Sequence, residues 1–249
     1  MESQQEHGRP ERRKGLSVLP DRQAEAAQLV ALLMERGAAE AAEISARATW
    51  LLRIAVLSAT TTLAEDGIKH AVRAAISAGL RASDILETLE CVSILGIHTP
   101  SVAIPILWDE LSARGQLQQA LDGVAEANSG STVTRSRYWR DINHDQDEFV
   151  DKMSKLCPSL LDVFVELGSV PWTRTDAALS DIEKELIYIA IDAAPTHMYV
   201  AGLRFHIRQA LAIGATPEQI LHALAVASTV GLEAWAQGLQ VLDDVLQET

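Results

Sequence analysis

The sequence predicts an all-α protein made of two tandem helical repeats. Apolar residues recur at helical spacing along most of the chain, and no segment alternates with period two for long enough to form a strand. Residues 51–97 align without a gap on residues 186–232, 135 positions later, and about 14 of the 47 aligned pairs are identical. Positions kept in both copies are expected to serve the fold, whereas polar residues present in only one copy are candidates for chemistry.

The first repeat is predicted to span residues 21–114, after a disordered tail over residues 1–20 that is charged and rich in turn-forming residues. Ser83 is expected to cap one helix, and Gly79 to end another in the left-handed conformation that glycine tolerates. Apolar spacing and these signals predict helices over residues 21–36, 38–58, 65–78 and 84–95, and a last helix that ends near residue 114.

A polar stretch over residues 115–136, rich in Gly, Ser, Asn and Gln near its end, is predicted to link the copies. The second repeat then spans residues 137–249. Ser180 and Glu183 have the spacing of a capping box, and Thr216 followed by proline is a strong helix-start signal. These signals predict an amphipathic segment over residues 147–168 and helices over 181–194, 197–213, 217–230 and 232–247.

Charge and hydropathy exclude several classes of protein. The net charge of −13 and the pI near 4.9 argue against nucleic acid as a partner, because binding to phosphates needs clustered Lys and Arg. The sequence shows no uninterrupted apolar run of the roughly 18 residues that a membrane span needs, and no signal-peptide core behind its N-terminus. We therefore expect a cytoplasmic protein that does not enter membranes.

The two cysteines, Cys91 and Cys157, lie far apart in the sequence, each in an apolar helical context. This pattern is typical of buried thiols and not of a disulfide framework. Two cysteines are too few for a thiolate zinc site, and none of the seven histidines forms an i, i+4 pair. A histidine-based metal site stays open as an alternative, but the sequence favours a protein with no metal site and no cofactor.

One segment resembles a known family. It begins at Glu185 and reads ELIYIAIDAAPTHMYVAGLRFHIRQALAIGATPEQI, with a Glu-Leu that opens an apolar helix, a loop, a helix that bears a histidine, and then Gly-Ala-Thr and Glu-x-Ile. This pattern resembles the carboxymuconolactone decarboxylase and alkylhydroperoxidase D-like superfamily, strongly over residues 170–232 and more weakly over 45–107. The resemblance implies a helical bundle that assembles as a homo-oligomer, usually a trimeric or other ring.

The resemblance also separates two kinds of chemistry. Peroxidase-type members of the superfamily carry cysteines seven and four residues before the histidine, where one thiolate attacks the peroxide and the other resolves it. Counted back from His206, these positions hold Tyr199 and Gly202. Thiol peroxidase activity is therefore disfavoured, and the decarboxylase branch, which keeps the histidine without the cysteines, is favoured.

Three residues are candidates for catalysis: His206, Glu185 and His197. His206 would act as a general acid or base, and the aligned residue in the first copy is alanine. Glu185 matches the family's glutamate, which belongs to a proton relay in thiol members. His197 is expected in the first turn of its helix, where the positive end of the helix dipole lowers an imidazole pKa and favours an anion. Each also has a structural alternative, as a core histidine, a solvated glutamate or a surface residue.

Tyr199, Arg204 and Arg208 are candidates for substrate binding. Tyr199 shares a helix face with His206, and the two arginines could hold a carboxylate through paired hydrogen bonds. However, the first copy repeats the two arginines as Lys69 and Arg73, which favours a surface or ion-pair role for them.

The first copy offers one candidate of its own, His98, whose partner in the alignment is Glu233. If the copies pack about a pseudo-twofold axis, His98 of the first could face His206 of the second. The expected result is a composite, asymmetric site that is shared between the copies.

The function that this reading favours is a cofactor-free lyase that decarboxylates a small carboxylated lactone such as 4-carboxymuconolactone. His206 would deliver a proton to carbon, Glu185 would orient it, and His197 and Tyr199 would donate hydrogen bonds. The small carboxylate substrate is the expected partner besides further copies of the chain. The alternatives are a non-catalytic oligomeric scaffold or subunit of the same fold, and an isomerase or hydrolase that acts on a related acid.

Overall fold

The computed structural model describes residues 19–39, 45–127 and 147–248. Over these residues the chain forms helices joined by turns, without a strand, which confirms the predicted fold class. Residues 1–18 of the expected tail and residues 128–136 of the expected linker lie outside the described residues.

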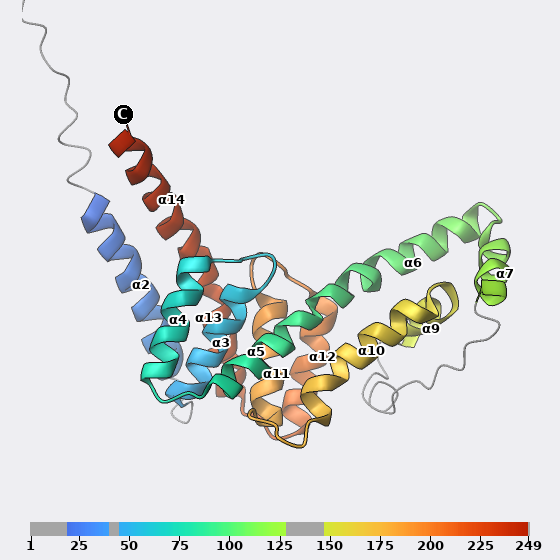
Figure 1. Ribbon diagram of the computed structural model, residues 1–249, viewed down its shortest axis with the longest axis horizontal. Coiled ribbons are helices and arrows are strands. Elements are labelled where there is room, and N and C mark those ends of the chain that lie inside the picture. Colours follow the sequence, from blue (N-terminus) through green and yellow to red (C-terminus); the bar gives the residue numbers. More distant parts are fainter. Residues whose placement is uncertain (1–18, 40–44, 128–146, 249) are drawn as a thin grey trace, which may run out of the picture.

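The helices follow one another in the same order in each repeat (Figure 1). Those of the first repeat are α2 (Leu19–Ala39), α3 (Ala46–Ser58), α4 (Glu65–Ser77), α5 (Ala82–Ser93), the short 3₁₀ helix η1 (Ile94–Ile97), α6 (His98–Ala113) and α7 (Leu117–Ala127). Those that follow are α9 (Asp147–Leu156), α10 (Pro158–Thr173), α11 (Asp181–Ala193), α12 (Val200–Ala212), α13 (Pro217–Ser228) and α14 (Val230–Glu248).

The backbone repeats as closely as the sequence does. The bounds of α3, α4 and α5 differ from those of α11, α12 and α13 by the same 135 positions that separate the aligned sequences. The unusual backbone angles repeat too: Leu63 and Met198 have φ values of 40° and 50°, and Gly79 and Gly214 have 91° and 95°. Gly79 therefore takes the left-handed conformation expected of it after a helix.

The two repeats share one hydrophobic core instead of forming two separate ones. Helix α3 packs directly against α11, and α5 and α13 pack against both. The core joins Leu51, Ile54 and Val56 of the first repeat to Leu186 and Ile189 of the second. The sequence suggests two small domains, but the tandem copies interlock into a single packed unit.

An approximate twofold axis relates the copies. Thr61 and Thr196, which are aligned with each other, are hydrogen-bonded through their hydroxyls at 3.0 Å. Contacts between the copies are also made in matching pairs. Thr49 contacts His222 at 3.0 Å, and the residues aligned with these two, Lys184 and Glu87, form a buried ion pair at 3.4 Å.

The copies also exchange their first helices. Helix α2 packs on α13 and α14 of the second repeat, whereas α9 and α10 pack on α5, η1 and α6 of the first. Figure 1 shows the result as two arms, α2 with α14 on one side and α6 with α9 and α10 on the other. Helix α6 begins beside the second repeat, and α14 begins beside the first. His98, the first residue of α6, therefore lies against the second repeat.

Several helix boundaries differ from the sequence predictions. Helix α5 begins at Ala82, with Arg81 as its cap residue and Asp84 accepting a 2.7 Å hydrogen bond from the Arg81 amide, so the prediction that Ser83 caps it is wrong. The amphipathic segment over 147–168 divides at Cys157, because proline at 158 disfavours a helical backbone in the preceding residue. Helix α7 lies within the stretch predicted as a linker.

The helix predicted over 197–213 begins three residues later, at Val200. Thr196 therefore does not cap it and instead joins the hydroxyl contacts with Thr61 and Thr62. By contrast, Ser180 with Glu183 and Thr216 with Gln219 form capping boxes, so the start signals of α11 and α13 are confirmed.

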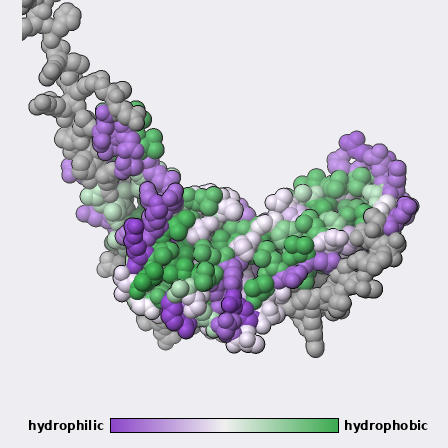
Figure 2. Space-filling view, viewed as in Figure 1, coloured by the Kyte–Doolittle hydropathy of each residue, from purple (hydrophilic) through white to green (hydrophobic). Residues whose placement is uncertain are grey.

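Among the described residues, one run, Ala82–Ala113, is long and apolar enough to cross a membrane by length and hydropathy. It consists of α5, η1 and α6, and α5 packs against α3 and α11, so part of this apolar surface serves the core. Figure 2 shows hydrophobic surface along the arm that α6 and α10 form. Exposed apolar residues on these helices include Val102, Ile106, Leu107, Leu160 and Val163.

Candidate active site

Five of the seven site residues predicted from the sequence lie on or beside α11 and α12. Helices α11 and α12 carry one each, the turn between these helices carries two, and α6 of the other repeat supplies the fifth. With two further residues they form what we call the polar cluster: His98 of the first repeat and Glu185, Tyr188, Asp192, His197, Tyr199 and His206 of the second.

The first part of the cluster is a pair formed by Glu185 and His206. The Nδ1 atom of His206 lies 2.8 Å from a carboxylate oxygen of Glu185, and the side chains are 18% and 5% exposed. The Tyr188 ring stacks on the imidazole with centroids 4.7 Å apart, and Phe205 meets its edge at 5.0 Å. Since Glu185 engages Nδ1, the ring is held in place and Nε2 is the nitrogen left for a ligand.

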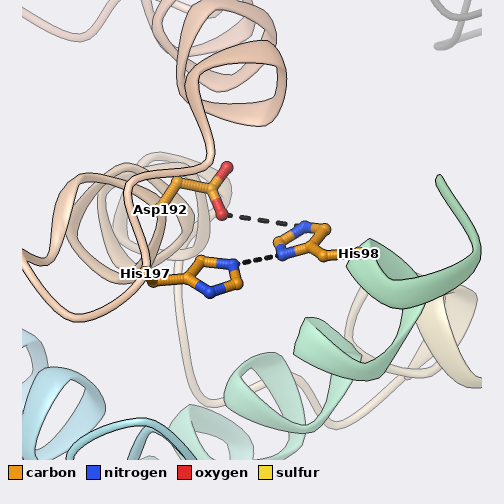
Figure 3. A group of neighbouring side chains, drawn as sticks. All are labelled: His98, Asp192 and His197. Atoms are coloured by element: carbon orange, nitrogen blue, oxygen red, sulfur yellow. Dashed lines mark hydrogen bonds and ion pairs between the residues drawn. The ribbon is translucent and has the colours of Figure 1, made fainter. Parts of the chain in front are cut away.

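The second part is a trio formed by His98, Asp192 and His197 (Figure 3). The Nδ1 atom of His98 lies 2.5 Å from Nε2 of His197, and its Nε2 lies 3.7 Å from an oxygen of Asp192. The His98 ring also stacks on Tyr199 with centroids 3.9 Å apart. His98 thus comes from the first repeat but makes all these contacts with the second.

Burial controls protonation in the trio. Asp192 is 1% exposed, and burial raises the pKa of its carboxyl to about 7, with Glu185 adding to the rise and His206 opposing it. Burial, followed by the nearby His197 and His206, lowers the pKa of His98 to about 3. Near neutral pH, therefore, His98 is uncharged and Asp192 is partly protonated. The influence of His206 on both groups shows that the trio and the pair share one electrostatic environment.

Tyr199 connects the cluster to α6. Burial raises the pKa of its phenol, a hydrogen bond with Ser101 lowers it, and the nearby Asp192 raises it, with a net rise. The phenol therefore stays protonated at neutral pH and remains a hydrogen-bond donor. Ser101 in turn donates to the carbonyl of His98 at 2.9 Å.

Gly202 makes room for the cluster. A Cβ atom at this position would collide with Oδ2 of Asp192 and lie 2.6 and 2.8 Å from two atoms of the Tyr199 ring. At the aligned Gly67, a Cβ would meet only side-chain methyl groups of Leu57 and Ala64, at 3.3 Å or more. Gly202 thus permits close helix packing, as the sequence suggests, and also leaves space for two polar site residues.

The corresponding place in the first repeat has no comparable cluster. The residues aligned with Glu185, Asp192, Tyr199 and His206 are Trp50, Leu57, Ala64 and Ala71. The residue aligned with Tyr188 is Arg53, which forms an ion pair at 2.9 Å with Glu233, the counterpart of His98. Acid–base groups are therefore concentrated at the second repeat.

Arg204 and Arg208 do not lie where a substrate-binding role requires, and the surroundings of His197 differ from those predicted. Arg204 and Arg208 are exposed, and each lies two residues from His206, about 160° around the helix. The structure does not bring them to the polar cluster. His197 lies in the turn before α12 and not in its first turn, so burial, not the helix dipole, lowers its pKa.

Asp192 and Tyr188 are the residues that sequence reasoning missed. Both stand in the second copy only, aligned with Leu57 and Arg53. The comparison of copies therefore contained the signal for Asp192, a polar residue at a position that is apolar in the other copy. No family motif drew attention to it, because it lies near the end of the Glu185 helix, away from the glutamate and the histidine that carry the resemblance.

The cysteines are free, and Cys91 is buried whereas Cys157 is half-buried. Burial raises the pKa of Cys91 to about 12, despite an opposing hydrogen bond from Tyr188, and also raises that of Cys157. We expect native protein at about pH 8 to leave Cys91 unmodified by a disulfide reagent such as DTNB, and both thiols to react in denaturant. Rapid modification of both thiols in the folded protein would contradict the arrangement described here.

Comparison with known proteins agrees with this fold. Residues 158–244, which contain the second-repeat part of the polar cluster, match the profile of the Carboxymuconolactone decarboxylase family. The chain also resembles the crystal structure of a proposed gamma-carboxymuconolactone decarboxylase subunit from Burkholderia xenovorans LB400. The TM-score is 0.69 and the identity 28%, over 94% of this chain and 98% of that one. A comparison with curated proteins gave no match.

Over its described residues the protein is thus an all-α tandem repeat, and the polar cluster lies at the contact between its copies. The family match over residues 158–244 and the structural relative both support the carboxymuconolactone decarboxylase and alkylhydroperoxidase D-like superfamily, which the pattern around His206 predicts.

Proposed function

We propose that the protein is an enzyme of the carboxy-lyase type that acts on a small carboxylated lactone, such as 4-carboxymuconolactone, by acid–base chemistry. The observation that carries this proposal is the 2.8 Å contact between Glu185 and His206 in a half-buried cluster present in one repeat only. A half-buried imidazole that is oriented by a carboxylate is a common arrangement for a general acid. The family match over the same residues supports the reaction class.

The proposed reaction needs one bond cleavage and one proton transfer. When the substrate loses CO₂, the electron pair of the broken C–C bond is delocalised into the conjugated carbonyl as a dienolate. His206 then transfers a proton from Nε2 to carbon, and Glu185 at Nδ1 stabilises the imidazolium form before transfer. Tyr199 and His197 would donate hydrogen bonds to the dienolate oxygen.

The protonation of Asp192 fits an anionic substrate. An ionised carboxylate at this place would repel the substrate carboxylate, but the pKa of Asp192 is raised to about 7 by burial. A protonated Asp192 removes this repulsion and can donate a hydrogen bond. Binding is therefore expected to weaken as the pH rises above about 7.

We also propose that the protein works as a homo-oligomer in the cytoplasm. Exposed apolar side chains on α6 and α10, among them Ile106 and Val163 at 60% and 59% exposure, support an interface between copies. The structural relative is itself described as a subunit. A non-catalytic subunit is the second candidate, and it is favoured by the loss of acid–base residues from the first repeat.

The deciding experiment follows loss of 4-carboxymuconolactone and release of CO₂ by the purified protein and by His206→Ala. Wild type should turn the substrate over, and the variant should lose about 10²- to 10⁴-fold in kcat/KM. His70→Ala is the matched control, since His70 is exposed on α4 and aligns with Phe205. Absence of turnover in a folded wild type would exclude this substrate, and equal turnover in His206→Ala would exclude the assigned acid.

A further inference from the structure

We propose that His98, Asp192 and His197 form a binding site for a divalent transition-metal ion of the Zn²⁺ class. This inference goes beyond the proposed lyase chemistry and does not depend on it: with the ion bound, Asp192 and His197 would be ligands, and the hydrogen-bonding roles proposed for them above apply to the protein without metal. One ligand atom from each of the three side chains lies within 4.8 Å of the others. The ligands come from the start of α6, the end of α11 and the turn before α12, so a search for paired histidines on one helix does not detect them.

The distances are close to those that one ion requires. Zinc bonds to nitrogen and oxygen are about 2.0–2.2 Å long, so two ligand atoms of a tetrahedral ion lie about 3.4 Å apart. The 3.7 Å between His98 Nε2 and Asp192 Oδ1 is near this value. The 2.5 Å contact with His197 Nε2 is made by the other ring nitrogen of His98, Nδ1, and one imidazole cannot turn both nitrogens toward the same ion. One nitrogen of each ring would therefore bind the ion. Rotation of the two imidazoles would break their mutual contact and bring the three ligand atoms, which lie within 4.8 Å of one another, to the spacing that the ion requires.

Asp192 provides the independent sign of a ligand. Its side chain is 1% exposed, and its Oδ2 atom is buried without a hydrogen-bond partner. A carboxylate placed in this way is costly unless a cation or a proton compensates it. Beside it lie two imidazoles whose pKa values are lowered by burial, and the uncharged imidazole is the form that binds metal. A cation bound at Oδ1, the oxygen nearer His98, would compensate the charge of this carboxylate, whose unpartnered Oδ2 lies toward Gly202.

The surroundings hold the proposed ligands in place. The Tyr199 amide donates to the carbonyl of Asp192 at 2.9 Å, and the His197 amide donates to that of Ala194 at 2.8 Å, so the turn is fixed at both ends. Tyr199 stacks on His98, which limits the freedom of that ring. Gly202 leaves the space that the Asp192 carboxylate occupies. These contacts are of the kind that orient ligands around a metal.

The ligand set indicates the class of ion. Two imidazoles and one carboxylate suit Zn²⁺, Co²⁺, Ni²⁺ or Fe²⁺, whereas Mg²⁺ and Ca²⁺ prefer oxygen alone. Three protein ligands leave at least one coordination position for water or for an anionic oxygen of a ligand. The site also shares its electrostatic environment with His206, because His206 affects the pKa of both His98 and Asp192.

The test is metal binding by the intact chain after treatment with EDTA and removal of the chelator. Calorimetry with Zn²⁺ and visible absorption with Co²⁺ measure affinity, stoichiometry and coordination without any substrate. We expect one ion per chain, Co²⁺ bands typical of four or five ligands, and a higher Tm with Zn²⁺. Binding should weaken at least about 100-fold in His98→Ala, in His197→Ala and in Asp192→Asn.

Two controls separate the possible results. His70→Ala removes an exposed histidine outside the cluster, and His206→Ala removes the proposed acid while leaving the trio intact; both should bind metal as wild type does. A folded wild type that binds no stoichiometric ion would overturn the proposal and leave the trio as a hydrogen-bonded chain. Equal binding by the trio variants would overturn it as well. Metal binding without turnover of 4-carboxymuconolactone would reject the proposed substrate and retain the metal site.

Discussion

Gly202→Ala is expected to disable the polar cluster while the fold persists. The new methyl group would collide with Oδ2 of Asp192 and lie 2.6 Å from the ring of Tyr199, so both side chains must move. A displacement of about 1 Å in a site can reduce the rate about 100-fold, and overpacking typically destabilises a protein by about 1–3 kcal/mol. We therefore expect at least a 100-fold loss of turnover and of metal affinity, with a Tm lowered by several degrees.

Gly67→Ala is the matched control, because Gly67 and Gly202 occupy the same position of α4 and α12. Its methyl group would meet Leu57 methyl groups at 3.3 and 3.4 Å, which can yield by a few tenths of an ångström. Alanine is also favoured over glycine in a helix by up to about 1 kcal/mol. Stability should therefore change little, and turnover and metal binding should stay close to wild type. Similar losses in both variants would mean that the glycines matter for helix packing alone.

The tandem arrangement explains why the site is complete in one place only. Because α6 begins beside the second repeat, His98 reaches Asp192, His197 and Tyr199 there. The symmetrical position, at the start of α14, carries Glu233, which neutralises Arg53 of the first repeat. One of the two symmetry-related places thus carries acid–base groups, and the other carries a partly buried ion pair between the copies.

Local sequence signals predicted much of the fold. The capping boxes at Ser180 and Thr216 act within four residues, and each fixes a helix start as predicted. The start of α12 could not be predicted in this way. It follows a turn with Met198 at φ 50°, in which Thr196 contacts Thr61 of the other copy. The exchange of α2 and α10 between copies likewise depends on packing and leaves no local signal.

The site was predictable to the extent that residues near in sequence also lie near in space. Glu185 and His206 lie on consecutive helices, and the resemblance named both. His98 was accessible through the idea of a twofold arrangement, and the structure shows it against the second repeat, on His197 and Asp192. The arrangement of His98, Asp192 and His197 could not be predicted from the sequence. It depends on how three separate segments meet in the fold, and on the burial of the Asp192 carboxylate, which no sequence pattern indicates.

The free energy of unfolding of Asp192→Asn is expected to fall less than that of wild type as the pH rises. In the native state burial raises the pKa of Asp192 from 3.8 to about 7. The stability that this group contributes is fully present below pH 3.8 and is lost as the pH rises through about 7, because the unfolded chain releases the proton first. The total loss in wild type is on the order of 4 kcal/mol, at about 1.4 kcal/mol per pKa unit. Asparagine keeps the shape of the protonated acid but does not ionise.

The measurement is the free energy of unfolding by urea at about pH 5 and about pH 8.5, with EDTA present so that no metal holds Asp192 ionised. Relative to wild type, Asp192→Asn should gain about 2–3 kcal/mol between these conditions, since most of the titration lies between them. His98, whose lowered pKa acts in the opposite direction as the pH falls below 6.5, is present in both proteins, so its contribution largely cancels. Asp66→Asn removes a carboxyl that is 98% exposed and should show no such gain. A constant difference between Asp192→Asn and wild type across this range would show that Asp192 is ionised in the native protein at both conditions, and the account of a buried, partly protonated Asp192 would be wrong.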